Sequence, residues 1–535
     1  MIKRYKDFAG LRKIGRDTTG VQGILQIYIM HNNIFFLRVM EKKEVYWISA
    51  IFLITLSVRL ILAFTLPNFT YESYFDMRQV DHITKTGLPL FDDPLSYGGR
   101  HHLFLPFFHY LTSLFSLALP LSFVAKILPN LFIAALTIIT YLISRKITQN
   151  KTASLFSAGI AGFLPILFTT NRFTSEMLFL PLIFVNIYTF LNINRKQFLY
   201  GYIISFIILS FTSSATFLLL IGFGIYFLLS LLEKKKIDNA EIEVVLFSLF
   251  FFIWSQYLFF KNILLEQGIS FIWKNIPAQI ISQYFPMLSL TQSVILVSVI
   301  PFLTGIFVVY RSLFYFKNER MFFLISLVIS TTLLTWLRFI EFKLSLAFTG
   351  IILAILFAPF YQDTLQFLQK TKIHHLQKLF PRFILVLLVI TMIYPAITTA
   401  LQQEMPTTEE VTAFQWIKEN IPEDATILAL LEEGHLITFI GNRTNFMDDQ
   451  FTLIPDVEKR FAALTSLFTT QFQTEAISLF DEYNIRYIVL TPSAREKYNL
   501  TNLQYRLKEC FERIYDDEST KIYDVRCTLE KSQGG

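Results

Sequence analysis

The chain has 535 residues, of which 53% are hydrophobic and 16% are charged, and its formal net charge is +6. Soluble domains carry about 25% charged residues, so this composition excludes an ordinary soluble protein and indicates a chain that lies largely in lipid. The surplus Lys and Arg residues fall between apolar segments, which explains the net charge without nucleic-acid binding. With two cysteines, a disulfide scaffold and a cysteine zinc site are both excluded.

Residues 1–45 form a basic segment that we expect to lie in the cytoplasm. The first long apolar stretch starts near Tyr46, which is too late and too long for a cleaved secretory signal. Residues 18–37 are weakly apolar, so they are expected either to form an interfacial helix or to be disordered. Translation from Met40 is the remaining alternative.

Apolar runs recur along residues 46–401, and each true membrane span needs about 20 residues. The runs lie at about 46–67, 104–120, 122–144, 152–171, 176–193, 198–212, 213–232, 241–261, 289–310, 321–337, 342–361 and 382–401.

The positive-inside rule decides which runs cross the membrane. If residues 104–120 cross, the later basic loops all fall outside. If they lie in the interface, the basic loops from Arg145 to Arg382 fall inside instead. We therefore predict a multi-pass α-helical membrane protein with about eleven transmembrane helices in residues 46–401, an interfacial helix at 104–120, and an extracytoplasmic tail, residues 402–535.

Residues 68–103 are the most polar stretch of the membrane half, and they open the external loop 68–120 that we expect to be catalytic. Glu72 and Asp76 are four residues apart, so they share one face if the segment is helical, and Arg78 lies close by. A carboxylate beside an apolar surface has a raised pKa, which suits a general base, and paired carboxylates bind Mg²⁺ or Mn²⁺. The alternative is that these groups are solvated loop charges.

Two further charged sites are predicted on the same outer face. Glu176 lies at the mouth of a span, where it either joins the first loop or only offsets the helix dipole. Arg338 and Lys343 flank Glu341 between two spans, where charges are costly. These cations are candidates for gripping a phosphate, and the alternative is an internal Arg338–Glu341 ion pair.

The tail is predicted to be a soluble α/β domain. Thr407 and Glu410 indicate a capping box before a helix at 408–420. The final two predicted strands form a hairpin that would bring Cys510 opposite Cys527, either as a disulfide or as two free thiols. The other predicted elements are strands at 425–430, near 443–447 and at 485–490, and helices at 433–440, 456–468 and 472–483.

The segment YESYFDMRQVDHITKTGLPLFDDPLSYGGR resembles the first external loop of the GT-C glycosyltransferases, and is most similar to the catalytic subunit of archaeal and eukaryotic oligosaccharyltransferases. The resemblance implies that Glu72 occupies the catalytic acidic position and Arg78 the basic one. It also implies that Glu176 ends the second acidic motif and that Arg338 belongs to the late span that contacts a lipid pyrophosphate.

The chain departs from this family at three places. The sequence Leu430-Leu431-Glu432-Glu433-Gly434 replaces the acceptor-reading motif WWDYG, so the resemblance does not extend to an Asn-X-Ser/Thr acceptor. Thr174 stands where the second acidic motif has a carboxylate. Loop 262–288 is short and offers only Glu266 as an acidic residue.

These features predict a membrane glycosyltransferase that moves a sugar or oligosaccharide from a polyprenyl-(pyro)phosphate donor to a protein, lipid or glycan acceptor on the extracytoplasmic face. The alternatives are a transporter or lipid-handling membrane protein, or a scaffold whose tail binds partners. The expected catalytic residues are Glu72, Asp76 and Glu176, the expected phosphate-binding residues are Arg338, Lys343 and Arg78, and the ligands of any Mg²⁺ or Mn²⁺ are Glu72 and Glu176.

Overall fold

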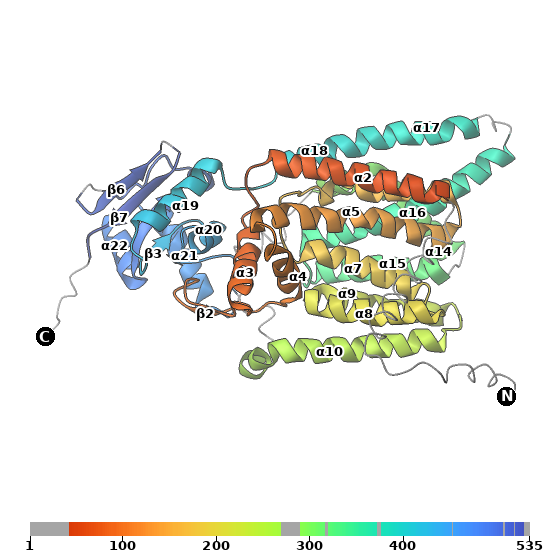
Figure 1. The fold of residues 1–535 in the computed structure, drawn as a ribbon, viewed down its shortest axis with the longest axis horizontal. Helices are drawn as coiled ribbons and strands as arrows, with labels where there is room; N and C mark the ends of the chain where they lie inside the picture. Colours follow the sequence, from red (N-terminus) through yellow and green to blue (C-terminus); the bar gives the residue numbers. More distant parts are fainter. Residues whose placement is uncertain are drawn as a thin grey trace, which may run out of the picture. The chain divides into compact units, whose positions relative to one another are not determined.

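The computed structural model describes residues 42–268, 289–315, 319–371, 376–451, 453–506, 509–517 and 519–528 (Figure 1). The expectations for residues 18–37, for Met40 and for the side chain of Glu266 therefore lie outside the described residues. The chain divides into two units, Met1–Ala50 and Ile51–Gly535. The helix α2 (Lys42–Thr65) begins in the first unit and continues into the second.

Each of the predicted membrane segments contains a helix. In Figure 1 the helices α5, α7, α15 and α16 run side by side, and α7 contacts both α5 and α8. The helices that follow α2 in this bundle are α5 (Leu121–Thr148), α6 (Lys151–Gly162), α7 (Glu176–Phe190), α8 (Lys196–Thr212), α9 (Phe217–Leu232), α10 (Asn239–Gln267), α13 (Leu290–Val297), α14 (Val299–Phe314), α15 (Glu319–Trp336), α16 (Phe342–Lys370), α17 (Leu376–Leu388) and α18 (Tyr394–Leu401).

Within the described residues, six helices are long and apolar enough to cross a membrane, and the bent pair α13–α14 would be a seventh. The helices α7, α8 and α15 are apolar but shorter. α6 has 12 residues, or about 18 Å, and the chain leaves it for a short 3₁₀ turn at Pro165–Leu167. The protein is therefore a multi-pass membrane protein, and the number of eleven crossings stays a prediction.

Between α2 and α5, the first external segment folds into two helices and a small hairpin. α3 (Ser73–Thr86) is followed by the antiparallel pair β1 (Asp92–Asp93) and β2 (Arg100–His101), and then by α4 (Phe107–Ser116). With ten residues, α4 is about 15 Å long, which is half the thickness of a bilayer core. This length agrees with an interfacial helix at 104–120 and not with a crossing.

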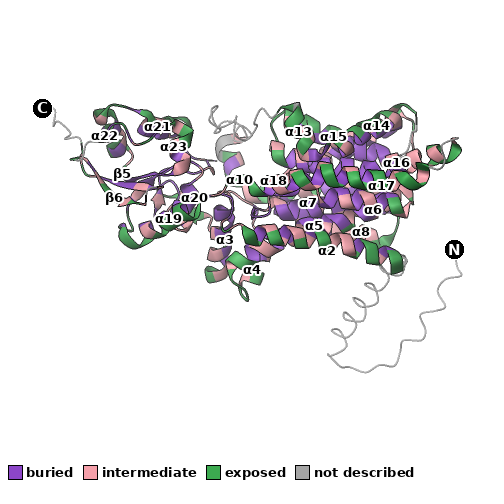
Figure 2. Ribbon diagram, turned by 90° about the horizontal axis from the view of Figure 1, so that it is seen from above, coloured by how far each residue is buried: buried purple, intermediate pink, exposed green. Residues whose placement is uncertain are grey.

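Aromatic residues fill the bundle core. The ring of Phe190 lies 4.7 Å from those of Phe223 and Phe323, and these side chains are buried. The outer faces of the helices are also apolar, as at Leu231 and Phe250, which are 66% and 71% exposed. Figure 2 shows buried residues inside the bundle and exposed ones on its rim. A bundle that is apolar on both sides is suited to lipid.

The tail contains a mixed five-stranded sheet in the order β4-β3-β5-β7-β6. The strands β4, β3 and β5 are parallel, β7 runs antiparallel to β5, and β6 runs antiparallel to β7. The predicted capping box of Thr407 and Glu410 is present at the start of the first helix. The elements are α19 (Thr408–Asn420), β3 (Thr426–Leu428), α20 (Gly434–Phe439), β4 (Thr444–Asn445), α21 (Val457–Thr469), α22 (Gln473–Glu482), β5 (Ile485–Leu490), α23 (Pro492–Tyr498), β6 (Phe511–Asp516) and β7 (Lys521–Val525).

A disulfide joins Cys510 to Cys527 across the final hairpin, with 4.9 Å between the two Cα atoms. The sequence left open whether these cysteines form a disulfide or remain free thiols, and the structure contains the disulfide. The bond closes a loop with a sequence separation of 17 residues just outside β6 and β7.

Replacing Cys510 with Ser is expected to lower the free energy of unfolding of the sheet by about 3 kcal/mol, because the open loop gains conformational entropy when the chain unfolds. Thermal unfolding of the full chain with and without a reductant measures this loss. The wild type should fall to the value of the variant under reducing conditions, and the variant itself should not respond. A variant as stable as the oxidised wild type would contradict the expectation.

Candidate active site

Three carboxylates from distant parts of the chain converge on one buried arginine, Arg172. Its Nε lies 2.7 Å from Glu72 Oε1, and its Nη2 donates to Glu72 Oε2 at 3.0 Å. Its Nη1 lies 2.9 Å from Glu176 Oε2, and Glu341 Oε2 is 3.8 Å from Nη2. The first external segment, the connection before α7 and the connection before α16 therefore meet at one point.

Each of these three carboxylates lies at the start of a helix. Glu72 immediately precedes α3, Glu176 is the first residue of α7, and Glu341 immediately precedes α16. Positive ends of helix dipoles favour negative groups at such positions. Arg172 reaches Glu176 because the two residues are four apart, on the same side of the turn that leads into the helix.

Hydrogen bonds of the backbone and of two side chains hold the connection that carries Arg172 against the start of α3. Thr70 N donates to Asn171 O at 3.2 Å, and Phe173 N donates to Ser73 Oγ at 2.9 Å. Asn171 Nδ2 donates to Asn68 O at 2.7 Å. The Arg172–Glu72 contact is therefore built on a fixed pair of loops.

Arg172 is strongly held in its charged form. Burial alone would lower the pKa of its guanidinium, but the charges of Glu176, Glu72 and Glu341 outweigh this effect and raise the pKa above the ordinary value. The Arg172 side chain is 9% exposed, whereas that of Glu72 is 38% exposed. Glu72 thus keeps an accessible carboxylate that is oriented by a buried cation, which is the arrangement that a general base needs.

Asp76 lies one helical turn after Glu72, where it is buried and hydrogen-bonded to a histidine. His109 Nε2 is 2.6 Å from Asp76 Oδ1, so the bond joins α3 to α4. Burial raises the pKa of Asp76, although the bond to His109 opposes this rise. Because Asp76 is buried and bonded to His109, it is better suited to hold α3 against α4 than to contact a substrate.

Arg78 already has a partner. Its two terminal nitrogens donate to both oxygens of Asp93, at 2.6 and 2.7 Å, and His102 Nε2 lies 3.2 Å from Asp93. Although burial alone raises the pKa of Asp93, the bond to His102 and the charge of Arg78 lower it to about 2. The fork of Arg78 therefore holds the β1–β2 hairpin against α3, and we do not retain it as a phosphate-binding residue.

A groove of about 440 Å³ lies between the end of α15 and the start of α16. Arg338 lines it together with Thr335 and Ser345, and apolar side chains such as Phe342 and Trp336 form the rest of its wall. Arg338 has a left-handed backbone conformation with φ of 61°, at the turn that also carries Glu341. Lys343 is exposed but does not line the groove.

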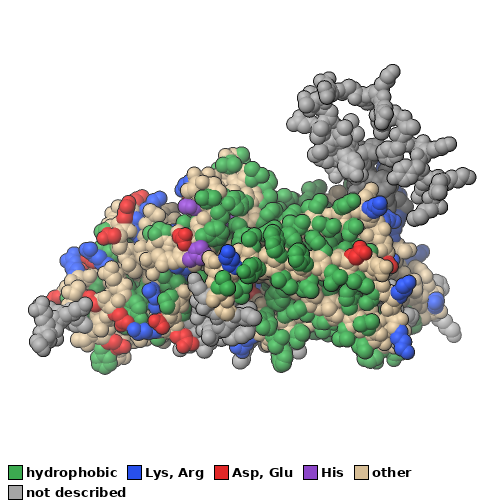
Figure 3. All heavy atoms as spheres, turned by 90° about the horizontal axis from the view of Figure 1, so that it is seen from below, with side chains coloured by type: hydrophobic (Ala, Val, Ile, Leu, Met, Phe, Trp, Pro, Cys, Tyr) green, Lys and Arg blue, Asp and Glu red, His purple; other side chains and the backbone are tan. Residues whose placement is uncertain are grey.

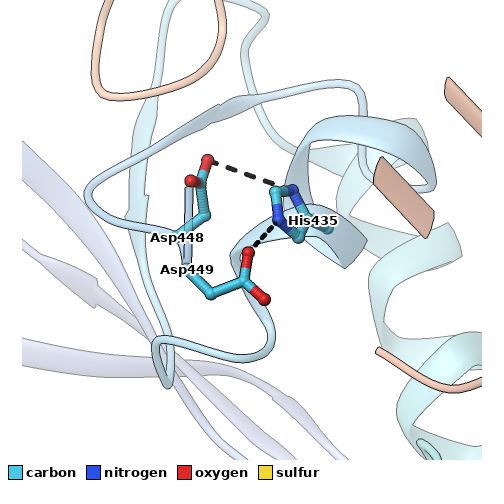
Figure 4. Close-up of side chains that lie close together, drawn as sticks. All are labelled: His435, Asp448 and Asp449. Carbon is cyan, nitrogen blue, oxygen red and sulfur yellow. Dashed lines mark hydrogen bonds and ion pairs between the residues drawn. The ribbon is translucent and has the colours of Figure 1, made fainter. Parts of the chain in front are cut away.

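A histidine with two aspartates lies in the tail, at a place that the sequence did not indicate (Figure 4). His435 Nε2 is 2.6 Å from Asp449 Oδ1, and its Nδ1 is 4.0 Å from Asp448 Oδ2. Although burial disfavours a charged ring, the two aspartates raise the pKa of His435. These three residues offer ligand atoms within 4.8 Å of one another, so their donor types suit a divalent cation.

Asp448 also fastens the β1–β2 hairpin to the tail. Ser96 Oγ donates to Asp448 Oδ2 at 2.7 Å, and the Tyr97 hydroxyl donates to the Asp448 carbonyl at 2.5 Å. Tyr97 N donates to Asn445 Oδ1 at 2.8 Å, and Arg100 Nη1 lies 3.7 Å from Asp448. We call these contacts the hairpin clasp, and they bring the tail onto the segment that carries Glu72.

Within the LLEEG segment, Glu433 is fully buried. Thr491 Oγ1 donates to one of its oxygens at 2.6 Å, and Leu430 N donates to the other at 3.0 Å. Burial, and next the charge of Glu410, raise the pKa of Glu433 to about 8. The neighbouring Glu432 instead forms an ion pair with Lys497 near the surface, at 2.9 Å.

Protein stability is expected to fall as the pH rises from about 5 to about 8 because of Glu433. Its pKa in the folded state exceeds the ordinary value, so the folded state binds more protons than the unfolded state across this window. The contribution is at most about 1.4 kcal/mol per pH unit. Unfolding midpoints against pH should show a flatter slope for Glu433→Gln, whereas Glu432→Gln should keep the wild-type slope. An unchanged slope in Glu433→Gln would count against a protonated Glu433.

A metal shared by Glu72 and Glu176 does not fit the described geometry. Both carboxylates already contact Arg172, so a divalent ion bound by both would lie beside a buried guanidinium and be repelled by it. The His435 group remains the arrangement among the described residues with donor atoms that suit a metal.

The α-helical bundle, the external segment with its short α4 and the tail with its mixed sheet agree with the fold that the resemblance implied. No family model and no curated protein matches the sequence. Solved structures share the fold at low sequence identity, which shows the fold alone.

The archaeal oligosaccharyltransferase AglB from Archaeoglobus fulgidus, in complex with an inhibitory peptide and a dolichol-phosphate, has a TM-score of 0.64 at 14% identity, over 84% of this chain and 70% of AglB. A complex of the Archaeoglobus fulgidus oligosaccharyltransferase with Zn and sulfate has a TM-score of 0.63 at 14% identity, over 88% and 72% of the two chains. ArnT from Cupriavidus metallidurans, bound to undecaprenyl phosphate, has a TM-score of 0.55 at 11% identity, over 91% and 98%.

Sequence reasoning found Glu72 and Glu176 but missed Arg172, which joins them. The sequence NRFTSE did contain a signal for the Arg172–Glu176 pair, because a cation there lies four residues before an acid at the mouth of a span. Glu341 was considered only as a partner for Arg338, whereas the structure places it near Arg172.

Proposed function

We propose that this protein is a membrane glycosyltransferase that transfers a sugar or oligosaccharide from a polyprenyl-(pyro)phosphate donor to an acceptor on the extracytoplasmic face. The observation that carries the proposal is the convergence of Glu72, Glu176 and Glu341 on Arg172. The turn that carries Glu341 also carries Arg338, which lines the adjoining groove. The GT-C-like fold, shared with proteins described with dolichol-phosphate and with undecaprenyl phosphate, supports it.

In this proposal the groove beside Arg338 receives the donor phosphate, because its apolar walls suit a prenyl chain and its cation suits a phosphate. The bond between the anomeric carbon of the sugar and the phosphate oxygen breaks, and the electron pair leaves with the phosphate. Arg338 offsets the charge that develops there.

Glu72 acts on the acceptor side. The half-exposed Glu72 carboxylate accepts the proton of the acceptor group as that group bonds to the anomeric carbon, so the proton ends on Glu72 and the sugar on the acceptor. Arg172 holds the Glu72 carboxylate in a fixed orientation before the reaction. Glu176 and Glu341 hold Arg172 from the other side, and Asp76 positions α3 through His109.

The same proposal places residues 46–401 in the membrane, the tail from residue 402 outside the cytoplasm and the basic residues 1–45 inside. Labelling of intact cells with a membrane-impermeant amine reagent would test this orientation, because the two cysteines are joined in the disulfide and offer no free thiol. The acceptor is a protein, a lipid or a glycan. LLEEG in place of WWDYG favours an acceptor other than an Asn-X-Ser/Thr peptide.

The direct test is mass spectrometry of the glycans and glycolipids of cells with and without the gene, followed by assay of the purified chain with dolichyl- or undecaprenyl-phosphate sugars. Release of the free polyprenyl phosphate reports cleavage of the donor bond before the acceptor is known, because water then takes the sugar. A glycan and glycolipid profile that does not change, with no release of polyprenyl phosphate, would refute the glycosyltransferase and favour a transporter or lipid-handling protein.

A further inference from the structure

A second pocket lies at the other end of the bundle from Arg172. α7 runs from Glu176 to Phe190, so about 21 Å of helix separate the two places. The pocket has a volume of about 240 Å³ and forms where α7 turns into α8, beside the end of α5 and the starts of α10 and α15. Phe190 and Phe323 line it and belong to the aromatic core.

One side of this pocket is cationic. Lys146 near the end of α5, Arg195 in the turn before α8 and Arg320 at the start of α15 all line it. Arg320 Nη1 donates to the carbonyl oxygen of Lys146 at 2.9 Å, which fixes the two residues together. Figure 3 shows Lys and Arg side chains around this end of the helices, beyond the apolar surface of the bundle.

The pocket is also acidic. Asp238 and Glu241, from the start of α10, line it as well. Asn194 Nδ2 donates to Asp238 Oδ2 at 3.1 Å, and the Tyr226 hydroxyl donates to Glu241 Oε2 at 3.3 Å, so neutral donors orient both carboxylates. The negative charges of these two acids would repel a phosphate, so a site that binds only phosphate would bind it more tightly without them.

We propose that this pocket binds the head group of an aminophospholipid, with the phosphate towards the cations and the primary ammonium towards Asp238 and Glu241. The pairing of three cations with two acids matches a group that carries both charges. Pockets with basic side chains at the ends of membrane helices are where lipid head groups are available. The proposal does not depend on glycosyl transfer.

Native mass spectrometry of the full chain with phosphatidylethanolamine, phosphatidylcholine and phosphatidylglycerol tests the proposal. Phosphatidylethanolamine should be retained about tenfold more than either other lipid. Lys146→Gln with Arg195→Gln should lower the retention of all three lipids, because the phosphate that they share loses two of its three cations. Lys196→Gln is the matched control, because Lys196 is exposed beside Arg195 and does not line the pocket. Equal losses in the control and the double variant would overturn the site.

Asp238→Asn tests the ammonium half separately. It should reduce retention of phosphatidylethanolamine and leave phosphatidylglycerol unchanged, and its thermal unfolding midpoint should match that of the wild type. Equal retention of the two lipids by the wild type would overturn the role of the acids. Soluble O-phosphoethanolamine should compete at high concentration only, and binding as tight as that of the lipid would show that a free amino-phosphate, and not a lipid, is the ligand.

Discussion

Replacing Glu72 with Gln should lower glycosyl transfer by about 10²–10⁴-fold, the range in which a lost general base reduces catalysis. The amide keeps the size of the side chain and one oxygen towards Arg172, so binding of the donor should change little. The assay is release of polyprenyl phosphate by the purified chain at saturating donor. Because Glu176 and Glu341 still offset the charge of Arg172, the variant should fold.

The matched control is Asp81→Asn. Asp81 lies on the same helix, but its ion pair with Lys85 is exposed and far less constrained than the contacts of Glu72. Its loss should leave transfer within twofold of the wild type. If Glu72→Gln keeps more than about a tenth of the activity while the control behaves as expected, the base is another residue, and Asp76 becomes the first to test.

Replacing Arg172 with Met should both stop transfer and destabilise the protein. The substitution leaves Glu72, Glu176 and Glu341 close together without their common cation, and removing one partner of a buried ion pair costs about 3–5 kcal/mol. The thermal unfolding midpoint in detergent should fall by several degrees. Arg311→Gln, which breaks a more exposed pair with Asp363, should cost about 0–1 kcal/mol.

A second substitution separates stability from activity. Arg172→Met with Glu176→Gln removes one of the carboxyl groups that Arg172 contacts, so it should recover part of the lost stability. Transfer should remain absent, since Glu72 is still without its orienting cation. Recovery of activity together with stability would mean that Arg172 is structural only and has no part in orienting the base.

Local signals in the sequence predicted the elements of the tail well. The capping box at Thr407, the apolar run at 485–490 and the paired strands between the two cysteines all carry their information within a few residues. The interfacial helix at 104–120 was instead predicted from distant residues, the charges of five later loops, and α4 in this segment is too short to cross. The sequence missed the helix α23, which is only seven residues long.

The candidate site depended on contacts between distant segments, and for these the sequence was a weaker guide. Glu72 and Glu176 were found because each is a charge at the edge of an apolar run. The partners of Arg78 and Asp76 were missed because Asp93 and His109 follow 15 and 33 residues later, in a hairpin and a helix whose packing the pattern does not encode. His435, Asp448 and Asp449 were also missed because the packing that brings them together is not encoded in a local pattern.

The hairpin clasp has a consequence for how the protein is made. Ser96 leaves the ribosome 352 residues before its partner Asp448. At about 5–20 residues per second, the first external segment waits roughly 20–70 s without the groups that cover it. During this interval its polar and aromatic side chains are open to membrane chaperones and proteases, and a chain that stops before Asp448 should be degraded instead of accumulating as an inactive bundle.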